Sequence, residues 1–229
     1  MRFYTNVQMV GDNFLVRGYE DGKHFATREK FYPTLFVDSK RKTKYKTLDG
    51  LPVEPIEPGT VRDCREFIKK YNDVENFNVY GNERFIYQYI SSKYPETELK
   101  FDIEQIKLTT IDIEVKSEYG FPDVESCAEE ILLITLQDYT TKQIRTWGLG
   151  AFNNKQENVI YKSFRTEYEL LTDFINWWMI EDNTPEVITG WNSKLYDIPY
   201  LCRRIDRILG EKLKKRMSPW GLVTEEETF

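Results

Sequence analysis

The sequence predicts a mixed α/β (α+β) protein with two domains, a mostly β domain over residues 1–105 and an α/β domain over residues 106–229. The length of 229 residues suits two domains of roughly 100–150 residues each. Hydrophobic residues make up 40% of the chain and aromatic residues 15%, which is enough to fill one or two cores. Near residue 105 the pattern changes from strand-like segments joined by turns to strands that alternate with helices.

The first domain is expected to open with a β-hairpin. Residues 3–10 and 14–19 have the composition of strands, and Gly11-Asp12-Asn13 between them suits a tight turn. A further β-like stretch covers residues 25–37. The start of the chain is therefore predicted to be a small antiparallel sheet.

A basic run at residues 40–46 leads from these strands to a predicted helix. Thr60 has the side chain of a helix cap and Asp63 stands in the first turn, so a helix is expected to begin here. The pattern of residues 80–94 leaves helix and strand open.

The second domain is expected to contain a sheet and two amphipathic helices. Thr166-x-x-Glu169 is a capping box, which predicts a helix after it. A loop at residues 191–196 leads to a second helix over residues 197–209, where apolar residues recur every three or four positions. The apolar face of the first helix is predicted to hold Tyr168, Leu171, Phe174, Ile175 and Trp178. Strands are predicted at residues 106–115, 131–136, 143–149, 159–164 and 185–190.

Composition excludes several classes of protein. The three cysteines, Cys64, Cys127 and Cys202, are odd in number and form no C-x-x-C pair, so neither a disulfide framework nor a cysteine zinc site is expected. A single histidine, His24, excludes histidine-rich metal sites and is interpreted as an ordinary strand or loop residue. No signal peptide follows Met1 and no apolar run has the length of a membrane span, so a cytosolic protein is expected.

The acidic excess lies in the second domain. The formal net charge is −6, and residues 1–105 carry 17 basic and 17 acidic side chains against 15 and 21 in residues 106–229. A general nucleic-acid-binding protein would be positively charged. Concentrated carboxylates instead suit a domain that binds divalent cations.

One carboxylate pair has the spacing of a metal site. If residues 106–115 form a strand, Asp112 and Glu114 share one face of it, because alternate side chains point the same way. Hard cations such as Mg²⁺ prefer oxygen ligands, and two of them can support phosphodiester hydrolysis. An acidic pair of this kind is more often a solvated strand edge. Asp102-Ile103-Glu104 is the nearest rival pair, so the context of the rest of the chain must decide.

Residues 189–200, which read TGWNSKLYDIPY, supply that context. With Asp112-Ile113-Glu114, this segment resembles the first two exonuclease motifs of family B DNA polymerases, in the version of T-even-type (cyanophage-like) bacteriophages. Residues 204–211 and 218–221 are similar to the same family, and a softer similarity extends through residues 1–105. The resemblance implies an RNase H-like 3′→5′ exonuclease domain that is incomplete at its C-terminal end. It also implies a phage DNA-directed DNA polymerase that acts in the cytoplasm of the bacterial host.

By this resemblance, Asp112, Glu114 and Asp197 are the catalytic and metal-binding carboxylates, which hold two Mg²⁺ or Mn²⁺ ions. Asn192 and Tyr196 are expected to contact the 3′-terminal nucleotides of DNA. Taken alone, Asp197 would be interpreted as a first-turn carboxylate at a helix N-terminus, and Trp191 and Tyr196 as core residues. The joint occurrence of both motifs favours the functional interpretation.

The sequence departs from the family pattern after Asp197, because no Tyr-x-x-x-Asp motif follows and no polymerase motif is present. We therefore expect a fragment that is weakly active or inactive alone, with polymerase and proofreading activity in the intact protein. An alternative is a non-catalytic nucleic-acid-binding module with vestigial carboxylates, and another is a complete stand-alone exonuclease.

Two basic clusters are candidate contacts for nucleic acid. Lys42 and Lys44, in the run at residues 40–46, are predicted to bind DNA, although a solvated loop is the commoner role of such a run. The resemblance also implies RNA as a partner of the N-terminal domain, and a sliding clamp as a partner of the full-length protein only. A second cluster, at residues 203–216, is interpreted either as steering the DNA backbone or as a salt-bridged surface helix.

Overall fold

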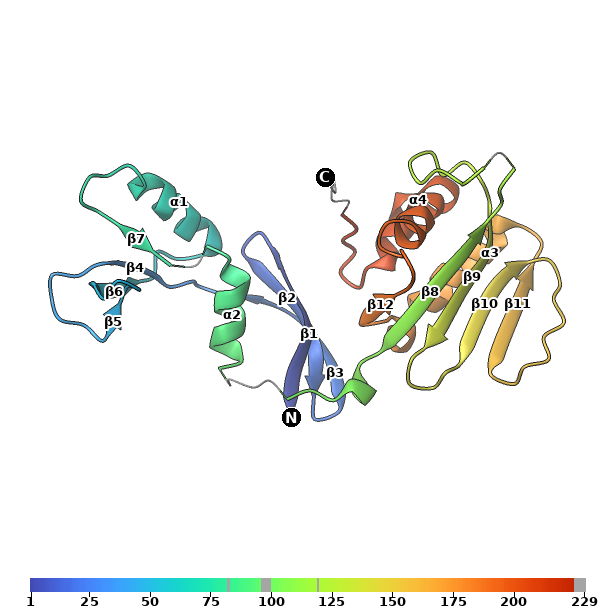
Figure 1. Cartoon of the computed structure of the whole chain (residues 1–229), viewed down its shortest axis with the longest axis horizontal. Coiled ribbons are helices and arrows are strands. Elements are labelled where there is room, and N and C mark those ends of the chain that lie inside the picture. The colour runs from blue at the N-terminus through green and yellow to red at the C-terminus, as the bar shows by residue number, and fades with distance from the viewer. Residues whose placement is uncertain (82, 96–99, 119, 225–229) are drawn as a thin grey trace. The chain divides into compact units, whose positions relative to one another are not determined.

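The structure is a computed structural model that describes residues 1–81, 83–95, 100–118 and 120–224. The chain forms two compact units, Met1–Ile103 and Glu104–Phe229. The first is mostly β and the second is α/β, which confirms the expected fold class (Figure 1). The change of unit falls in a short 3-10 turn, η1 (Ile103–Gln105), so the rival pair Asp102 and Glu104 does not lie on a strand.

A three-stranded antiparallel sheet opens the first unit. It consists of β1 (Arg2–Val10), β2 (Asn13–Glu20) and β3 (Lys23–Lys30), paired in chain order. The predicted hairpin is confirmed, and Gly11 in its turn has a φ of +60°. The predicted stretch at residues 25–37 is two strands, β3 and β4 (Leu35–Asp38). Pro33 lies between them and has no backbone N–H to donate to a ladder.

A four-stranded sheet with two helices completes the first unit. Its strand order is β5 (Tyr45–Lys46), β6 (Pro52–Ile56), β4 and β7 (Val79–Tyr80). Helix α1 (Val61–Tyr71) begins as predicted, because Thr60 and Asp63 form a reciprocal capping box. The undecided residues 80–94 contain the end of β7 and helix α2 (Phe85–Lys93). The core of this unit includes Phe14 and Tyr89, whose stacked rings lie 4.7 Å apart.

A five-stranded mixed sheet forms the centre of the second unit. Its order is β11 (Val159–Phe164), β10 (Ile144–Leu149), β9 (Ile131–Asp138), β8 (Leu108–Val115) and β12 (Val187–Thr189). Strand β8 runs antiparallel to β9 and parallel to β12. Because β12 is short, it pairs with Leu108–Thr110, and no strand of the described residues pairs with the second half of β8 on that side.

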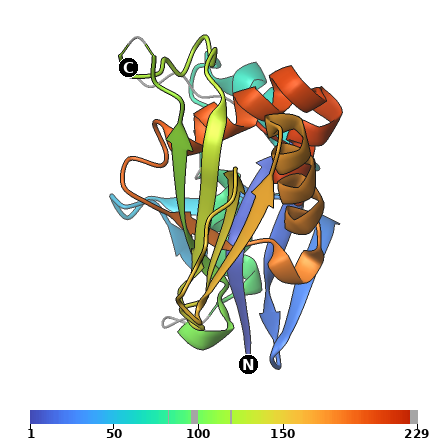
Figure 2. The same ribbon diagram turned by 90° about the vertical axis from the view of Figure 1, so that its right-hand side faces the viewer.

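Helices α3 (Glu167–Trp178) and α4 (Asp197–Leu209) cover one face of this sheet (Figure 2). Two short elements, α5 (Glu211–Lys214) and η3 (Lys215–Met217), follow α4, and η2 (Glu181–Asn183) follows α3. The core of this unit is built mainly from apolar and aromatic side chains, and burial of each large one contributes about 1.5–3 kcal/mol. Its members include Ile111, Ile134, Trp147, Phe174 and Tyr200.

Helix α3 differs from its prediction in two details. Tyr168 is 60% exposed, and Leu170 and Glu167 are buried with the other predicted face residues. Position 168 lies about 100° around the helix from 167, whereas 170, 171 and 174 follow 167 at the three- and four-residue spacing of one face. Thr166 caps the helix as predicted, but the Glu169 carboxylate accepts its return bond from the N–H of Arg165.

The three cysteines are buried, and the histidine lies on a strand. Cys64, Cys127 and Cys202 have thiols that are not joined in disulfides. His24 lies on β3, and its Nε2 is 3.3 Å from Nε of Arg17. Among the described residues, no helix combines the length and apolar character needed to cross a membrane.

Candidate active site

Asp112 and Glu114 lie on the same exposed face of β8. Along this strand burial alternates, so that Ile111 and Ile113 point into the core while the two carboxylates are exposed. The alternation predicted from the sequence is therefore present. Two carboxylates one strand repeat apart on an open face can both reach the same cation.

Asp197 is joined to β8 at this pair. It is the first residue of α4, its side chain is 4% exposed, and its Oδ1 accepts a hydrogen bond of 3.0 Å from the N–H of Ile113. That N–H is available because β12 ends at Thr189 and does not pair with this part of β8. The Asp197 carboxylate thus bonds to the residue between Asp112 and Glu114. Its place in the first turn of α4 does not by itself explain this bond to β8.

A tight turn brings the chain from β12 to this position. A β-carbon at Gly190 would lie 2.5 Å from the carbonyl oxygen of Ile111, so only glycine allows this approach. Ser193 is buried, and its carbonyl accepts the N–H of Ile198 in the first turn of α4. Asn192 is exposed and has a φ of +56°, a conformation that asparagine tolerates better than most residues. The predicted loop at residues 191–196 is confirmed.

Burial and a neighbouring charge act together on Asp197. Burial raises the pKa of its carboxyl group, and the negative charge of Asp112 raises it further, whereas the hydrogen bond from Ile113 lowers it. The two carboxylates are therefore close enough to repel one another. A divalent cation would relieve this repulsion, and the available donors are all carboxylate oxygens, the type that Mg²⁺ and Mn²⁺ prefer.

The three carboxylates do not by themselves form a closed cation cage. In the part of the chain that the structure describes, no group of three or more His, Cys, Asp or Glu side chains is gathered closely enough to hold a metal ion. Asp112 and Glu114 are open to further ligands, and Asp197 has one oxygen directed at the backbone. The residues present fit an open cation site that needs additional donors.

Tyr196, which precedes Asp197 in the chain, belongs to a group of three aromatic rings. Tyr196 is half-buried, and its ring lies 4.8 Å from that of Phe121 and 5.6 Å from that of Tyr200. Burial raises the pKa of the Tyr196 phenol, and the charges of Asp197 and Glu114 contribute to the same shift. All three effects favour the protonated form of the Tyr196 hydroxyl.

Two large aromatic side chains near the carboxylates in the chain are exposed. Phe121 is 81% exposed and was not predicted from the sequence, although Gly120 and Pro122 on either side of it mark a turn that holds a large apolar side chain. Trp191 is 95% exposed, so the alternative of a core residue, which applied to its segment taken alone, does not hold. The core of this unit includes Tyr200 and Leu201 of α4 instead.

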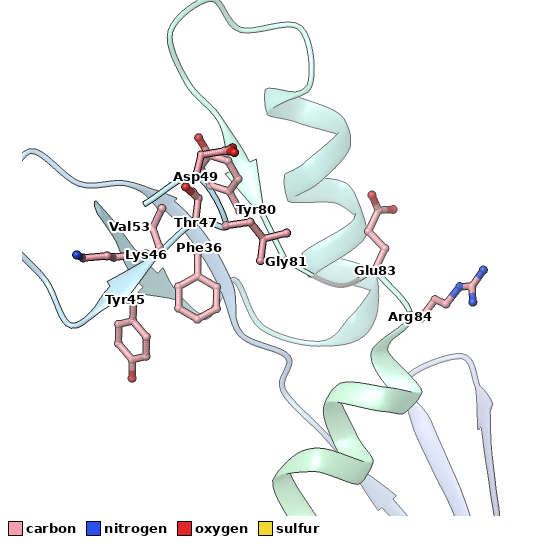
Figure 3. Close-up of a pocket in the computed structure, with 11 residues that line it drawn as sticks. Phe36, Tyr45, Lys46, Thr47, Asp49, Val53, Tyr80, Gly81, Glu83 and Arg84 are labelled. Carbon is pink, nitrogen blue, oxygen red and sulfur yellow. The ribbon is translucent and has the colours of Figure 1, made fainter. Parts of the chain in front are cut away.

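Lys42 and Lys44 belong to the first unit, whereas the three carboxylates belong to the second. Both are exposed in the connection between β4 and β5, and Nζ of Lys44 lies 4.8 Å from the ring centre of Tyr45. A groove of about 800 Å³ adjoins this connection, and Figure 3 shows the rings of Phe36 and Tyr45 pointing the same way at its wall. Those two rings are 5.3 Å apart.

Comparison with known proteins places the chain in a family. The model of the exonuclease domain of DNA polymerase family B matches residues 61–228. The DNA-directed DNA polymerase of Escherichia phage RB69 is 31% identical over 95% of this chain and 27% of its own length. That of Enterobacteria phage T4 is 30% identical over 96% of this chain and 27% of its own length. The DNA polymerase catalytic subunit of human herpesvirus 6A is 35% identical over 43% of this chain and 10% of its own length.

The chain thus spans about a quarter of the length of the phage relatives that it matches. The resemblance to phage polymerases is confirmed, and so is the RNase H-like α/β character expected of the second unit. This family of exonuclease domains uses divalent metal ions, which agrees with the acidic donor set described above. The chain belongs to family B of the DNA polymerases and contains sequence of their exonuclease domain.

Proposed function

We propose that Asp112, Glu114 and Asp197 are the carboxylates of a two-metal 3′→5′ proofreading exonuclease site. The observation that carries this proposal is the hydrogen bond from the N–H of Ile113 to Asp197, which fixes the buried carboxylate beside the exposed pair. The membership of the chain in family B supports the same reaction.

Each carboxylate has a distinct role in this proposal. Asp112, which shares a strand face with Glu114 and whose charge acts on Asp197, would be a ligand common to both divalent cations, while Glu114 would add a ligand to one cation and Asp197 to the other. When bound, the two cations supply an activated water and neutralise the charge on the leaving 3′-oxygen. The buried backbone bond keeps Asp197 from turning away, so that the ligands are positioned before substrate arrives.

The substrate is the unpaired 3′ end of DNA. Tyr196 and Phe121 present a pair of rings next to the carboxylates, and stacking on a base is worth roughly 1–3 kcal/mol without regard to sequence. Asn192, exposed at the turn before α4, is placed to contact the terminal nucleotide. A mismatched primer end frays more readily than a paired one, so it reaches such a site preferentially.

The test is a 5′-labelled single-stranded oligonucleotide incubated with Mg²⁺ or Mn²⁺, with Asp112→Ala as the matched control. Residues 198–229 contain no Tyr-x-x-x-Asp sequence, so we expect weak or no shortening by this chain alone. The same chain extended along its reading frame is expected to shorten the oligonucleotide stepwise from the 3′ end, and Asp112→Ala to abolish this. Absence of shortening by the extended protein would refute the nuclease proposal.

A non-catalytic nucleic-acid-binding module is the alternative function. It is favoured by the absence of a gathered ligand cage among the described residues. Mn²⁺ binding separates the two functions, because a vestigial site does not retain the ion. Paramagnetic broadening that is centred on Asp112 and lost in Asp112→Asn would support the exonuclease, and uniform weak broadening would support the alternative.

A second contact with nucleic acid is proposed for the first unit, through Lys42 and Lys44. Their exposure, and the aromatic groove beside them, suit an unpaired strand of DNA or RNA (Figure 3). The variant Lys42→Glu/Lys44→Glu is expected to weaken binding of oligonucleotides, with Lys69→Glu/Lys70→Glu on α1 as the control. Equal affinities of parent and variant for both DNA and RNA would exclude this contact. A sliding clamp as partner, and action in the host cytoplasm, are part of the proposal for the whole polymerase only.

A further inference from the structure

The segment between β8 and β9, residues 116–130, is held against α4 by side chains that bond to its backbone. Five consecutive or nearly consecutive carbonyl groups of this segment accept hydrogen bonds from one helix. The donors and acceptors are Arg203 to Val124 (2.9 Å), Arg207 to Ser126 (3.0 Å), Arg204 to Cys127 and Ala128 (2.9 and 3.0 Å), and Tyr200 to Glu129 (2.8 Å).

Arg204, the central arginine among these donors, is itself held in place by an ion pair. Arg204 and Glu167 are both 5% exposed, and two hydrogen bonds of 2.6 Å join the guanidinium to the carboxylate. The same carboxylate accepts the N–H of Ile131, the first residue of β9. The row is therefore anchored to α3 and to the sheet as well as to α4.

The held segment has a backbone that needs support. Cys127 has a φ of +42°, in the left-handed region that residues with a β-carbon rarely adopt. Such a conformation persists only where surrounding contacts impose it. The carbonyls of Cys127 and of its neighbours on both sides are the ones that Arg204 and Arg207 hold.

The near end of the same segment reaches the proposed exonuclease site. Phe121 is exposed except where its ring meets Tyr196, the residue that precedes Asp197. Helix α4 thus connects both partners of this aromatic pair: Tyr196 lies at its first turn, and its arginines hold the segment that carries Phe121.

We propose that Arg203, Arg204 and Arg207 are positioning residues that hold Phe121 against Tyr196, where the pair receives the 3′-terminal base. The proposal rests on the exonuclease function proposed above. It replaces the interpretation of these arginines as DNA-steering charges, because their guanidinium groups bond to backbone carbonyls of the protein. Arg203 and Arg204 also form ion pairs with Glu125 and Glu167, as the alternative of a salt-bridged helix predicts. In this proposal the arginines affect DNA binding by fixing the position of the Phe121 ring.

The test uses Arg203→Gln/Arg207→Gln, which leaves the buried Arg204–Glu167 pair intact. The matched control is Arg216→Gln, which removes an exposed positive charge from the same basic cluster. Arg216 bonds to none of the residues of the segment that the structure describes. Binding of a fluorescein-labelled oligothymidylate in Ca²⁺ is measured by anisotropy, together with amide hydrogen exchange in residues 120–130 and in β9. Both variants are also made in the Phe121→Ala background.

We expect Arg203→Gln/Arg207→Gln to accelerate exchange in residues 120–130 but not in β9. The variant is expected to weaken oligonucleotide binding roughly fivefold or more, the lower range for loss of one base–aromatic stack. In Phe121→Ala the same two substitutions should change affinity by less than about twofold, because the ring through which they act is gone. Arg216→Gln should leave both readouts unchanged.

Two results would overturn the positioning role while leaving the exonuclease proposal in place. One is a loss of affinity that persists in Phe121→Ala or is matched by Arg216→Gln, because either means that charge alone is responsible. The other is faster exchange in residues 120–130 with unchanged affinity. A parent protein that binds no oligonucleotide would refute the exonuclease proposal itself, and the positioning role with it.

Discussion

The basic run at residues 40–46 and the arginines of α4 look alike in the sequence, but the protein uses their charges differently. Of the residues that the structure describes, none forms an ion pair with a lysine or arginine of the run, and Lys42 and Lys44 are exposed. On α4, Arg203, Arg204 and Arg207 are hydrogen-bonded to the backbone of residues 124–128.

The difference shows that a basic side chain is available to nucleic acid only where its donors are not already hydrogen-bonded within the protein. Lysine has a compact ammonium on a flexible stem and remains solvated in a loop. The planar guanidinium of arginine can satisfy a carboxylate and two carbonyls at once, as Arg204 does with Glu167, Cys127 and Ala128. A count of basic residues therefore overstates the surface that nucleic acid can contact.

Among variants that test this difference between the two basic clusters, Arg204→Met has the largest expected effect. The substitution leaves the Glu167 carboxylate buried without its partner, so the free energy of unfolding should fall by about 3–5 kcal/mol. Urea unfolding followed by far-UV circular dichroism measures this. The double variant Glu167→Leu/Arg204→Met removes both charges and should recover part of the loss. A single variant as stable as the parent would mean that the pair is not formed.

The arginines of α4 can bond to the backbone of residues 124–128 only if α4 packs closely on the sheet. The variant Gly190→Ala tests this packing at the turn between β12 and α4. The added methyl group would lie 2.5 Å from the carbonyl oxygen of Ile111, and overpacking of this kind costs about 1–3 kcal/mol. Leu195→Ala, in the same turn and 57% exposed, is the control, with an expected change within about 0.5 kcal/mol. Thermal unfolding of the three proteins gives the comparison, and equal stability of parent and Gly190→Ala would show that the turn is looser than described.

Asp197→Asn extends the comparison to a buried acidic side chain at the start of α4. The raised pKa of Asp197 comes first from burial and then from the charge of Asp112, so ionisation of this group opposes folding. The protonated form favours the folded state, and this advantage is lost as pH rises through the folded-state pKa. The amide can still accept the N–H of Ile113, so the variant should melt at a higher temperature than the parent at neutral pH. The difference in melting temperature between variant and parent should disappear at acidic pH. A variant that is less stable than the parent at neutral pH would contradict the prediction that ionisation of Asp197 opposes folding.

The smallest effect on stability is expected at the other cluster. Lys42→Glu/Lys44→Glu should change the free energy of unfolding by no more than about 0.5 kcal/mol, because both lysines are exposed and the contact of Lys44 with the ring of Tyr45 lies at the surface. The same urea experiment as for Arg204→Met supplies the measurement. A loss of several kcal/mol would show that the run is structurally engaged and remove the contrast.

Local patterns predicted most of the elements but few of the contacts between them. The bounds of α4 and the hairpin of β1 and β2 followed from periodicity and turn residues, because both signals are local. The break at Pro33 was missed because apolar residues continue on both sides of it. The prediction for Tyr168 is wrong because this residue lies about 100° around the helix from Glu167, whose face is the buried one.

The candidate site shows the same division. The shared face of Asp112 and Glu114 follows from the period of a strand, so the sequence predicts it. The bond between Asp197 and Ile113 depends on where β12 stops, and no local pattern reports that. Phe121 and Glu167 take their importance from Tyr196 and Arg204, which are distant in the sequence, so neither could be assigned without the fold.

The bond from Ile113 to Asp197 spans 84 positions of the chain and has a consequence for the order of folding. Contacts between residues this far apart form only after the intervening chain has closed into a loop, which is entropically costly and slow. The carboxylates therefore come together only when β8, β12 and α4 have already assembled. During refolding, the ability to retain Mn²⁺ should be the last property to return, after secondary structure, and a growing polypeptide should acquire it only once α4 has been synthesised.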